Sequence, residues 1–243
     1  MCTVTFIPSE HSVILTSNRD EKQIRATAEY PAVFEFDSGK ILFPKDADAG
    51  GTWIAVHENG NAIVLLNGGI IKHIPKPPYR KSRGLIVLDI LDSQKPFQAF
   101  RTMSLDNIEP FTLIICDQGI LYECRWDGEN RHILKPDPRE PHIWSSVTLY
   151  SPDVIAKREG WFRKWLKENN SPTQEDILLF HQFTGDGDAH NDLLMNRDGE
   201  TFTVSITSLK LDRSVTRVTY LDLKNNHKLH AEIALQKNTV SLK

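Results

Sequence analysis

The chain has 243 residues, of which 40% are apolar and 25% are charged, an ordinary composition for a globular protein with a sizeable core. Its formal net charge is -3, so the protein as a whole has no positive electrostatic field that would attract nucleic acid or an anionic membrane. The expected partner is therefore a small molecule. The three cysteines, Cys2, Cys116 and Cys124, form no CxxC pair, which argues against a disulfide framework or a zinc knuckle.

The N-terminal segment has the features of neither a secretory signal nor a membrane helix. It lacks a basic region, and its apolar stretch is broken by Pro8, Ser9 and Glu10. No run approaches the roughly 18 apolar residues of a membrane helix. We therefore expect a cytoplasmic protein without a membrane span, and the sequence does not define its oligomeric state.

The first 70 residues are predicted to form short strands separated by turns. Segments rich in β-branched and aromatic residues cover positions 3–7, 12–17, 40–43, 52–57 and 61–66. The last two are expected to pair as a hairpin. A basic, proline-rich connection, 72–80, then leads to Ser82, which is a suitable N-cap for a helix that ends near Asp92. With Arg83, this basic connection indicates a loop that meets an anionic ligand rather than a nucleic-acid surface.

The rest of the chain alternates between strand and helix patterns. A second hairpin is predicted at 111–116 and 119–126, with further strands at 132–134 and 143–149. Helices are predicted at 152–168 and 173–183, followed by strands at 201–207, 214–223 and 229–234. This order favours an α+β layered fold over a parallel βαβ repeat, in a single domain that spans residues 1–243.

Cys2 is the first candidate for chemistry. Removal of Met1 would place a thiol and a free α-amine on one residue, and an amine that titrates near pH 8 can accept the thiol proton. The alternative is that Cys2 is a small packed residue at the start of a strand.

The second candidate is the tetrapeptide Asn18-Arg19-Asp20-Glu21, which follows the predicted strand and could equally be a solvent-facing turn. If two neighbouring strands bring it beside Cys2, the Arg19 guanidinium lowers the thiol pKa. Asp20 can then hold the N-terminal ammonium.

Four motifs carry a family resemblance in the first 90 residues. MCT at the start, NRDE at 18–21, GGTW at 50–53 and SRG at 82–84 resemble, in this order, the NRDE-motif family that includes the Transport and Golgi organisation 2 proteins. The opening is also similar to the choloylglycine hydrolase and penicillin V acylase group. That resemblance implies an N-terminal-nucleophile hydrolase fold, a four-layer αββα sandwich, and cleavage of non-peptide amide bonds.

The resemblance implies a role for each matched residue. Cys2 is the nucleophile with its α-amine as base, Arg19 supports the thiolate and Asp20 orients the N-terminus. Asn67 is the expected oxyanion donor at a strand end, although Asn before Gly68 is also a turn signal. The implied function is a thiol-dependent amidohydrolase or acyltransferase acting on a small amide or thioester, without a cofactor or metal.

The sequence also departs from the pattern. Where much of the family has a Ser-Asn pair, this chain has Ser145-Ser146, so a second oxyanion asparagine is missing. The hydrolases that the chain resembles also have an arginine on a late strand. In this sequence the candidates for that position are Arg213 and Arg217. These departures favour a second hypothesis, a binding or trafficking protein without catalysis. The family resemblance implies a haem or lipid-related ligand for it, although no haem-ligand signature occurs in the sequence.

Overall fold

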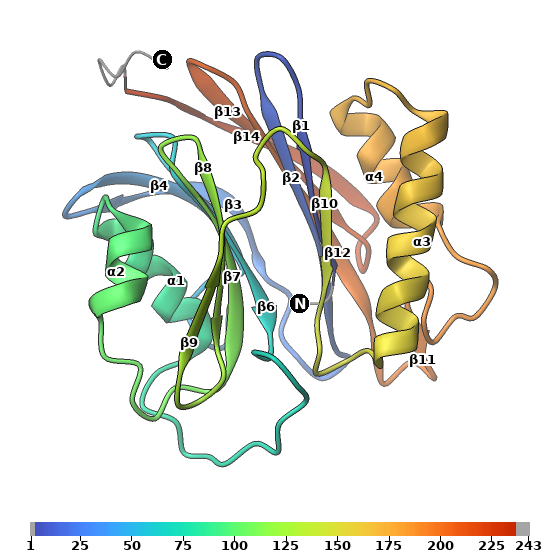
Figure 1. Ribbon diagram of the computed structural model, residues 1–243, viewed down its shortest axis with the longest axis horizontal. Coiled ribbons are helices and arrows are strands. Elements are labelled where there is room, and N and C mark those ends of the chain that lie inside the picture. Colours follow the sequence, from blue (N-terminus) through green and yellow to red (C-terminus); the bar gives the residue numbers. More distant parts are fainter. Residues whose placement is uncertain (1–2, 237–243) are drawn as a thin grey trace.

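Residues 3–236 are described by a computed structural model, in which they form four layers (Figure 1). Two antiparallel sheets of seven strands face each other. One pair of helices, α1 (Arg83–Asp92) and α2 (Pro96–Thr102), lies outside one sheet, and the other pair, α3 (Pro152–Glu168) and α4 (Gln174–Phe183), lies outside the other. The predicted α+β class and the αββα order of layers are thereby confirmed.

The first sheet contains strands from the beginning and from the end of the described chain. Its strands run in the order β10-β1-β2-β12-β13-β14, and β11 pairs with β12. The bounds are β1 (Thr3–Pro8), β2 (Val13–Lys22), β10 (His142–Ser145), β11 (Asn196–Arg197), β12 (Thr201–Leu211), β13 (Val215–Asp222) and β14 (His227–Ala234). Strand β2 therefore lies in the middle of the sheet, hydrogen-bonded on both sides.

The second sheet is a meander in which each strand pairs with the next along the chain. Its members are β3 (Glu29–Phe36), β4 (Gly39–Lys45), β5 (Ile54–His57), β6 (Ala62–Asn67), β7 (Phe111–Asp117), β8 (Ile120–Trp126) and β9 (Arg131–Leu134). Both predicted hairpins, β5 with β6 and β7 with β8, are present.

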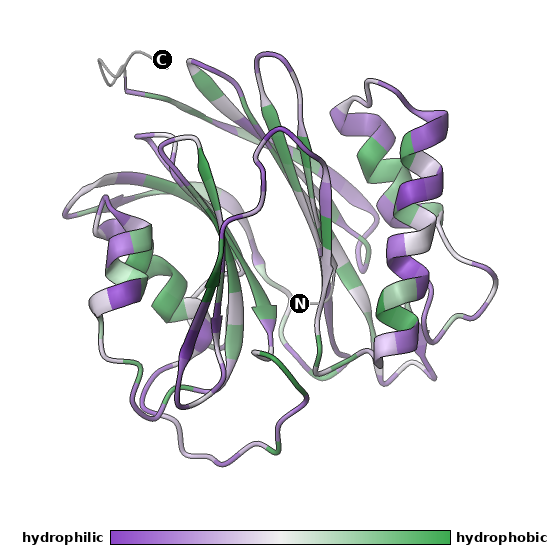
Figure 2. Cartoon of the chain, viewed as in Figure 1, coloured by the Kyte–Doolittle hydropathy of each residue, from purple (hydrophilic) through white to green (hydrophobic). Residues whose placement is uncertain are grey.

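A continuous apolar core fills the space between the sheets. Val4 and Leu15 of the first sheet and Ile54 and Ile114 of the second are fully buried and belong to one cluster. Figure 2 shows hydrophobic residues along the strands of both sheets and hydrophilic residues over much of α3. Burial of this apolar surface is the main force that holds the layers together.

Side-chain caps begin two of the helices, and the cap at Ser82 was predicted. The Ser82 side chain accepts a hydrogen bond from the Leu85 N–H at the start of α1, and Thr173 forms a capping box with Asp176 at the start of α4. Among residues 3–236, no helix combines the length and the apolarity that a membrane crossing requires.

Two sequence-based expectations are wrong in detail, and two elements were missed. The NRDE tetrapeptide does not follow a strand, because β2 continues through it to Lys22. The strand predicted at 143–149 ends at Ser145, where a turn begins. Strand β3 and helix α2 were not predicted: β3 is largely exposed and contains Pro31, and α2 has only seven residues.

Candidate active site

The NRDE residues lie in a central strand, so their side chains alternate between its two faces. Asn18 points toward α4, where its Oδ1 accepts a hydrogen bond from His181 Nδ1 at 2.5 Å and its Nδ2 donates to the Leu193 carbonyl at 2.7 Å. His181 is buried, and burial followed by the Arg158 charge lowers its pKa to about 3. Asn18 and a neutral His181 thus join the strand to the helix layer.

Arg19 points between the sheets, toward the second one. Its Nη2 donates to Asp46 Oδ2 at 2.7 Å, and its guanidinium lies 4.6 Å from the centre of the Trp53 ring. The residue is only 2% exposed. Both contacts hold the planar guanidinium in one orientation.

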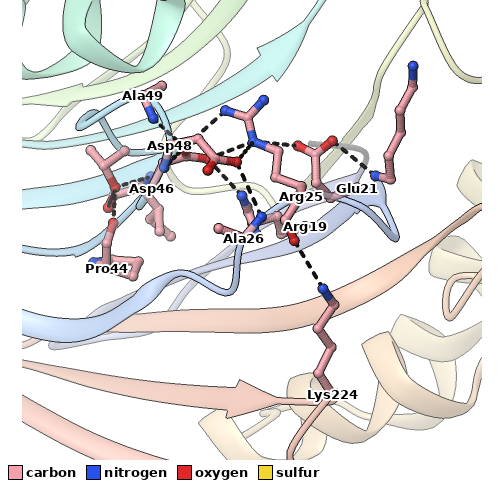
Figure 3. Close-up of polar contacts among 12 residues, drawn as sticks. Arg19, Glu21, Arg25, Ala26, Pro44, Asp46, Asp48, Ala49 and Lys224 are labelled. Carbon is pink, nitrogen blue, oxygen red and sulfur yellow. Dashed lines mark hydrogen bonds and ion pairs between the residues drawn. The ribbon is translucent and has the colours of Figure 1, made fainter.

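Asp46 is shared between two arginines (Figure 3). Besides Arg19, it accepts a hydrogen bond from Arg25 Nη2 at 2.9 Å and another from the Ala49 N–H at 2.9 Å. Burial opposes ionisation of Asp46, but the hydrogen bonds from Arg25 and Ala49 and the charges of both arginines prevail and lower its pKa. Asp46 is therefore a carboxylate at neutral pH, and it fixes the Arg19 side chain at the bottom of the site.

Asp20 is buried on the same face as Asn18. Tyr150 Oη donates to its Oδ2 at 2.7 Å, and Thr203 Oγ1 donates to its Oδ1 at 2.6 Å. Asp20 is thus oriented by residues that are far away in the sequence.

A buried arginine lies behind Tyr150. The Arg158 guanidinium of α3 is 3.6 Å from the Tyr150 ring centre, and it donates to the Asp192 carbonyl at 2.7 Å and to Thr3 Oγ1. Arg158 is fully buried. It connects helix α3 to the first residue of β1 and to the tyrosine that contacts Asp20.

Asn67 ends β6, as predicted, and its main chain is held by hydroxyl groups. Ser146 Oγ donates to the Asn67 carbonyl at 2.8 Å and lies 2.8 Å from Thr148 Oγ1. Gly68 follows with a φ of +88°, and a Cβ there would lie 2.7 Å from Thr148 Cγ2. Asn67 is therefore both a strand end and part of a tight turn that packs against residues 146–148.

The GGTW and SRG motifs meet at two glycines. A Cβ on Gly51 would lie 2.5 Å from the Leu85 nitrogen, and a Cβ on Gly84 would lie 2.9 Å from the Thr52 nitrogen. The Thr52 N–H donates to the Gly84 carbonyl at 3.2 Å. Only glycine permits this approach of two backbones, which brings the start of α1 beside Trp53.

These motifs surround one cavity of about 400 Å³, a volume typical of a small-molecule site. Its lining includes residues of NRDE, of GGTW and of SRG, together with Asn67. They are Arg19, Glu21, Arg25, Asp46, Ala49, Gly51, Thr52, Trp53, Leu65, Asn67, Tyr79, Lys81, Ser82, Arg83, Gly84 and Glu109. The structure thus gathers three of the four sequence motifs around a common space. A larger cavity of about 630 Å³ lies between α4 and strands β13 and β14 and contains none of the motif residues.

Cys2 lies outside the described residues. Its neighbour Thr3 pairs with Asn18 in the β1–β2 register. The other two cysteines lie in β7 and β8, and burial raises the pKa of both Cys116 and Cys124 to about 12. Neither of these two thiols supplies a thiolate near neutral pH.

Neither candidate for the late arginine lies at this cavity. Arg217 is paired with Asp212 at 2.7 Å, and Arg213 lies 3.3 Å from His11 Nδ1. The sequence interpretation missed Asp46, Tyr150 and Arg158, which contact the motif residues instead. Tyr150 and Arg158 carry no recognisable motif, and Asp46 stands four residues before GGTW without a diagnostic spacing.

Solved structures of hydrolases have a similar fold. A mutant of the conjugated bile acid hydrolase from Clostridium perfringens matches with a TM-score of 0.61 and 12% identity, over 100% of this chain and 99% of that chain. The N-acylethanolamine-hydrolyzing acid amidase ortholog of Caenorhabditis elegans matches with a TM-score of 0.55 and 12% identity, over 86% of this chain and 92% of that chain. Both are N-terminal-nucleophile hydrolases, so that fold is confirmed.

No curated protein matched the chain in sequence. The family model of Transport and Golgi organisation 2 matches residues 1–216. Because this match spans most of the 243 residues, the chain belongs to the Transport and Golgi organisation 2 family.

Proposed function

We propose that the protein is a thiol-dependent amidohydrolase or acyltransferase that acts on a small amide or thioester, with Cys2 as nucleophile. The observation that carries this proposal is the cavity that Arg19, Trp53 and Asn67 line together. Cys2 is bonded to Thr3, which pairs with Asn18, and consecutive Cα atoms are about 3.8 Å apart. The proposal requires Cys2 to reach Arg19 and Asp20, and its covalent link to Thr3 supports this.

The proposed reaction follows from these groups. The Cys2 thiolate attacks the acyl carbon, and the Cys2 α-amine takes the thiol proton and returns it to the departing amine or thiol. Water or a second amine then attacks the acyl-cysteine and releases the thiol. The Asn67 amide is the donor available for the oxyanion. Within each step, Asp20 holds the N-terminal ammonium during the interval in which the amine carries the transferred proton.

A chromogenic anilide of a short acyl group tests the function directly. We expect a burst of released aniline equal to the enzyme concentration, an acyl adduct on Cys2 by mass spectrometry, and neither with Cys2→Ala. A protein without a burst or adduct on anilides and thioesters alike contradicts the proposal.

A binding protein without turnover is the second candidate, and one observation favours it. At the place of the missing asparagine, the Ser146 hydroxyl donates to the Asn67 carbonyl, so its proton is engaged within the protein. Tight ligand binding without any acyl adduct would support this candidate.

Selective alkylation of the cysteines tests the role of Arg19. At pH 7 we expect iodoacetamide to modify Cys2 and to leave Cys116 and Cys124 unmodified, because burial raises the pKa of both to about 12. Arg19→Ala removes a cation and leaves the Asp46 carboxylate less compensated, so both changes raise the Cys2 pKa. The rate of Cys2 alkylation is expected to fall about tenfold, and Arg19→Lys is expected to retain part of it. An unchanged rate in Arg19→Ala removes Arg19 from the site.

The hydroxyl groups behind Asn67 provide a further test. We expect Ser146→Ala with Thr148→Val to lower kcat for the anilide about tenfold while KM changes little, because the two hydroxyls hold the Asn67 main chain. Ser145→Ala is the control, since the Ser145 side chain makes no hydrogen bond within residues 3–236. Equal kcat values in the double variant and the control would show that Asn67 needs no such support.

A further inference from the structure

The loop between β6 and α1 exposes isoleucines beside basic residues. Over positions 70–81, which we call the β6–α1 loop, the sequence contains Ile70, Ile71 and Ile74 with four Lys or Arg residues and no acidic residue. Figure 1 shows this loop at the lower edge of the molecule, away from both sheets. It is a local basic region in a protein whose net charge is -3.

The isoleucines of this loop are open to solvent. Ile71 is 75% exposed, Ile74 is 83% exposed and Ile70 is 44% exposed. Single exposed apolar residues are common, but three within five positions form a patch that indicates an interaction surface. Ile24, which precedes the cavity residue Arg25, is also 93% exposed.

Most of the positive charges in the loop are not compensated by carboxylates. Lys72 and Lys76 are exposed, and no ion pair of either is found within residues 3–236. Arg80 donates to the main-chain carbonyls of Ser104 and Asp106 at 2.7 and 3.1 Å, which leaves its charge in place. Of the four Lys and Arg residues, Lys81 alone pairs with an acid within residues 3–236, namely Asp89. The loop also contains His73, whose Nε2 lies 3.1 Å from Glu109 Oε1.

The backbone of the second half of the loop, residues 76–80, is held by hydrogen bonds. The Lys76 N–H donates to Tyr79 Oη at 2.7 Å, Asn107 Nδ2 donates to the Pro78 carbonyl at 3.1 Å, and the Arg80 N–H donates to the Asn107 carbonyl at 2.9 Å. These polar contacts involve residues 76–80, and the isoleucine side chains at 70, 71 and 74 remain exposed. The part of the loop that carries Lys76 and Arg80 is therefore pre-organised, which lowers the entropic cost of binding through these two residues.

We propose that the β6–α1 loop docks on an anionic phospholipid membrane. Ile71 and Ile74 would enter the boundary between headgroups and acyl chains, while Lys72, Lys76 and Arg80 meet lipid phosphates. Apolar residues flanked by basic ones are the combination that binds such interfaces. The charge complementarity selects this partner over an apolar protein surface, which would leave the lysines unpaired.

Docking would also orient the cavity. Tyr79 and Lys81 of the loop line the cavity together with Ser82 and Arg83, which follow directly. A docked loop therefore brings the cavity entrance close to the lipid surface, where amphiphilic substrates concentrate. Vesicle binding itself does not depend on Cys2 chemistry, so the two proposals succeed or fail separately.

Co-sedimentation with vesicles tests the proposal. We expect the full-length protein to bind vesicles of phosphatidylcholine with 30% phosphatidylserine, a composition chosen for roughly physiological surface charge, and to bind phosphatidylcholine alone at least about tenfold more weakly. Ile71→Ser with Ile74→Ser and, separately, Lys72→Glu with Lys76→Glu are each expected to reduce binding about tenfold or more.

Two control variants match these changes elsewhere on the surface. Phe183→Ser removes an apolar side chain that is 75% exposed on α4, and Lys164→Glu with Lys167→Glu reverses two exposed charges on α3. Both are expected to bind vesicles like the unmodified protein. Absence of binding to anionic vesicles, equal losses in controls and loop variants, or loop-dependent self-association in place of vesicle binding would each overturn the proposal.

Discussion

Protein that retains a residue before Cys2 is expected to hydrolyse the anilide roughly 10²- to 10⁴-fold more slowly than protein that begins at Cys2, which is the contribution of a well-placed general base. An additional residue converts the Cys2 amine to an amide, which accepts no proton near neutral pH. The reaction then lacks its proton acceptor. The comparison requires one sample that begins at Cys2 and one with an uncleavable Gly before it, both verified by intact mass.

The thiol itself provides the control for this comparison. Both samples keep Cys2, so a strongly activated thioester that needs no proton at its leaving group should react with both, with a smaller difference. Circular dichroism should show the same fold. If the extended protein turns over the anilide at the same rate, catalysis by the N-terminal amine is wrong, and the alkylation result for Arg19 is then interpreted on its own.

Gly84→Ala and Gly51→Ala are expected to lower the free energy of unfolding by about 3 kcal/mol each, as is typical of severe overpacking. A Cβ on Gly51 would lie 2.5 Å from the Leu85 nitrogen, and one on Gly84 would lie 2.9 Å from the Thr52 nitrogen. These neighbours are backbone atoms, so they cannot rotate away. Urea denaturation at constant m-value measures the loss.

Gly160 offers an internal comparison for the same substitution. It lies within α3, where an added Cβ meets no atom within 4 Å. Gly160→Ala is therefore expected to stabilise the protein by about 0.5–1 kcal/mol, because alanine loses less entropy in a helix. A similar destabilisation in all three variants would indicate that the Gly51–Gly84 approach has no special role.

The fold was predictable to the extent that local patterns determine it. Periodicity and capping residues located both hairpins and helices α1, α3 and α4. The wrong boundary at β2 has a physical cause: Asn18, Arg19 and Asp20 are polar, yet each is buried and paired with distant side chains. A sequence pattern treats such residues as solvent-facing, because it cannot include partners that only the tertiary structure provides.

The candidate site was predictable only where motifs exist. NRDE, GGTW and SRG indicated residues that the fold places around one cavity. Asp46, Tyr150 and Arg158 could not be found in this way, since their importance arises from contacts with the motif residues across the layers. The roles given to Cys2, Arg19, Asp20 and Asn67 remain predictions for the experiments above.

The central position of β2 has a consequence for biosynthesis. The Asp20 carboxylate is oriented by Thr203, a residue 183 positions later in the chain. At about 5–20 residues per second, a ribosome needs roughly 10 to 40 s to make that intervening segment. Throughout this interval β2 lacks its neighbour β12. The buried hydrogen bond of Asp20 can therefore form only late in synthesis.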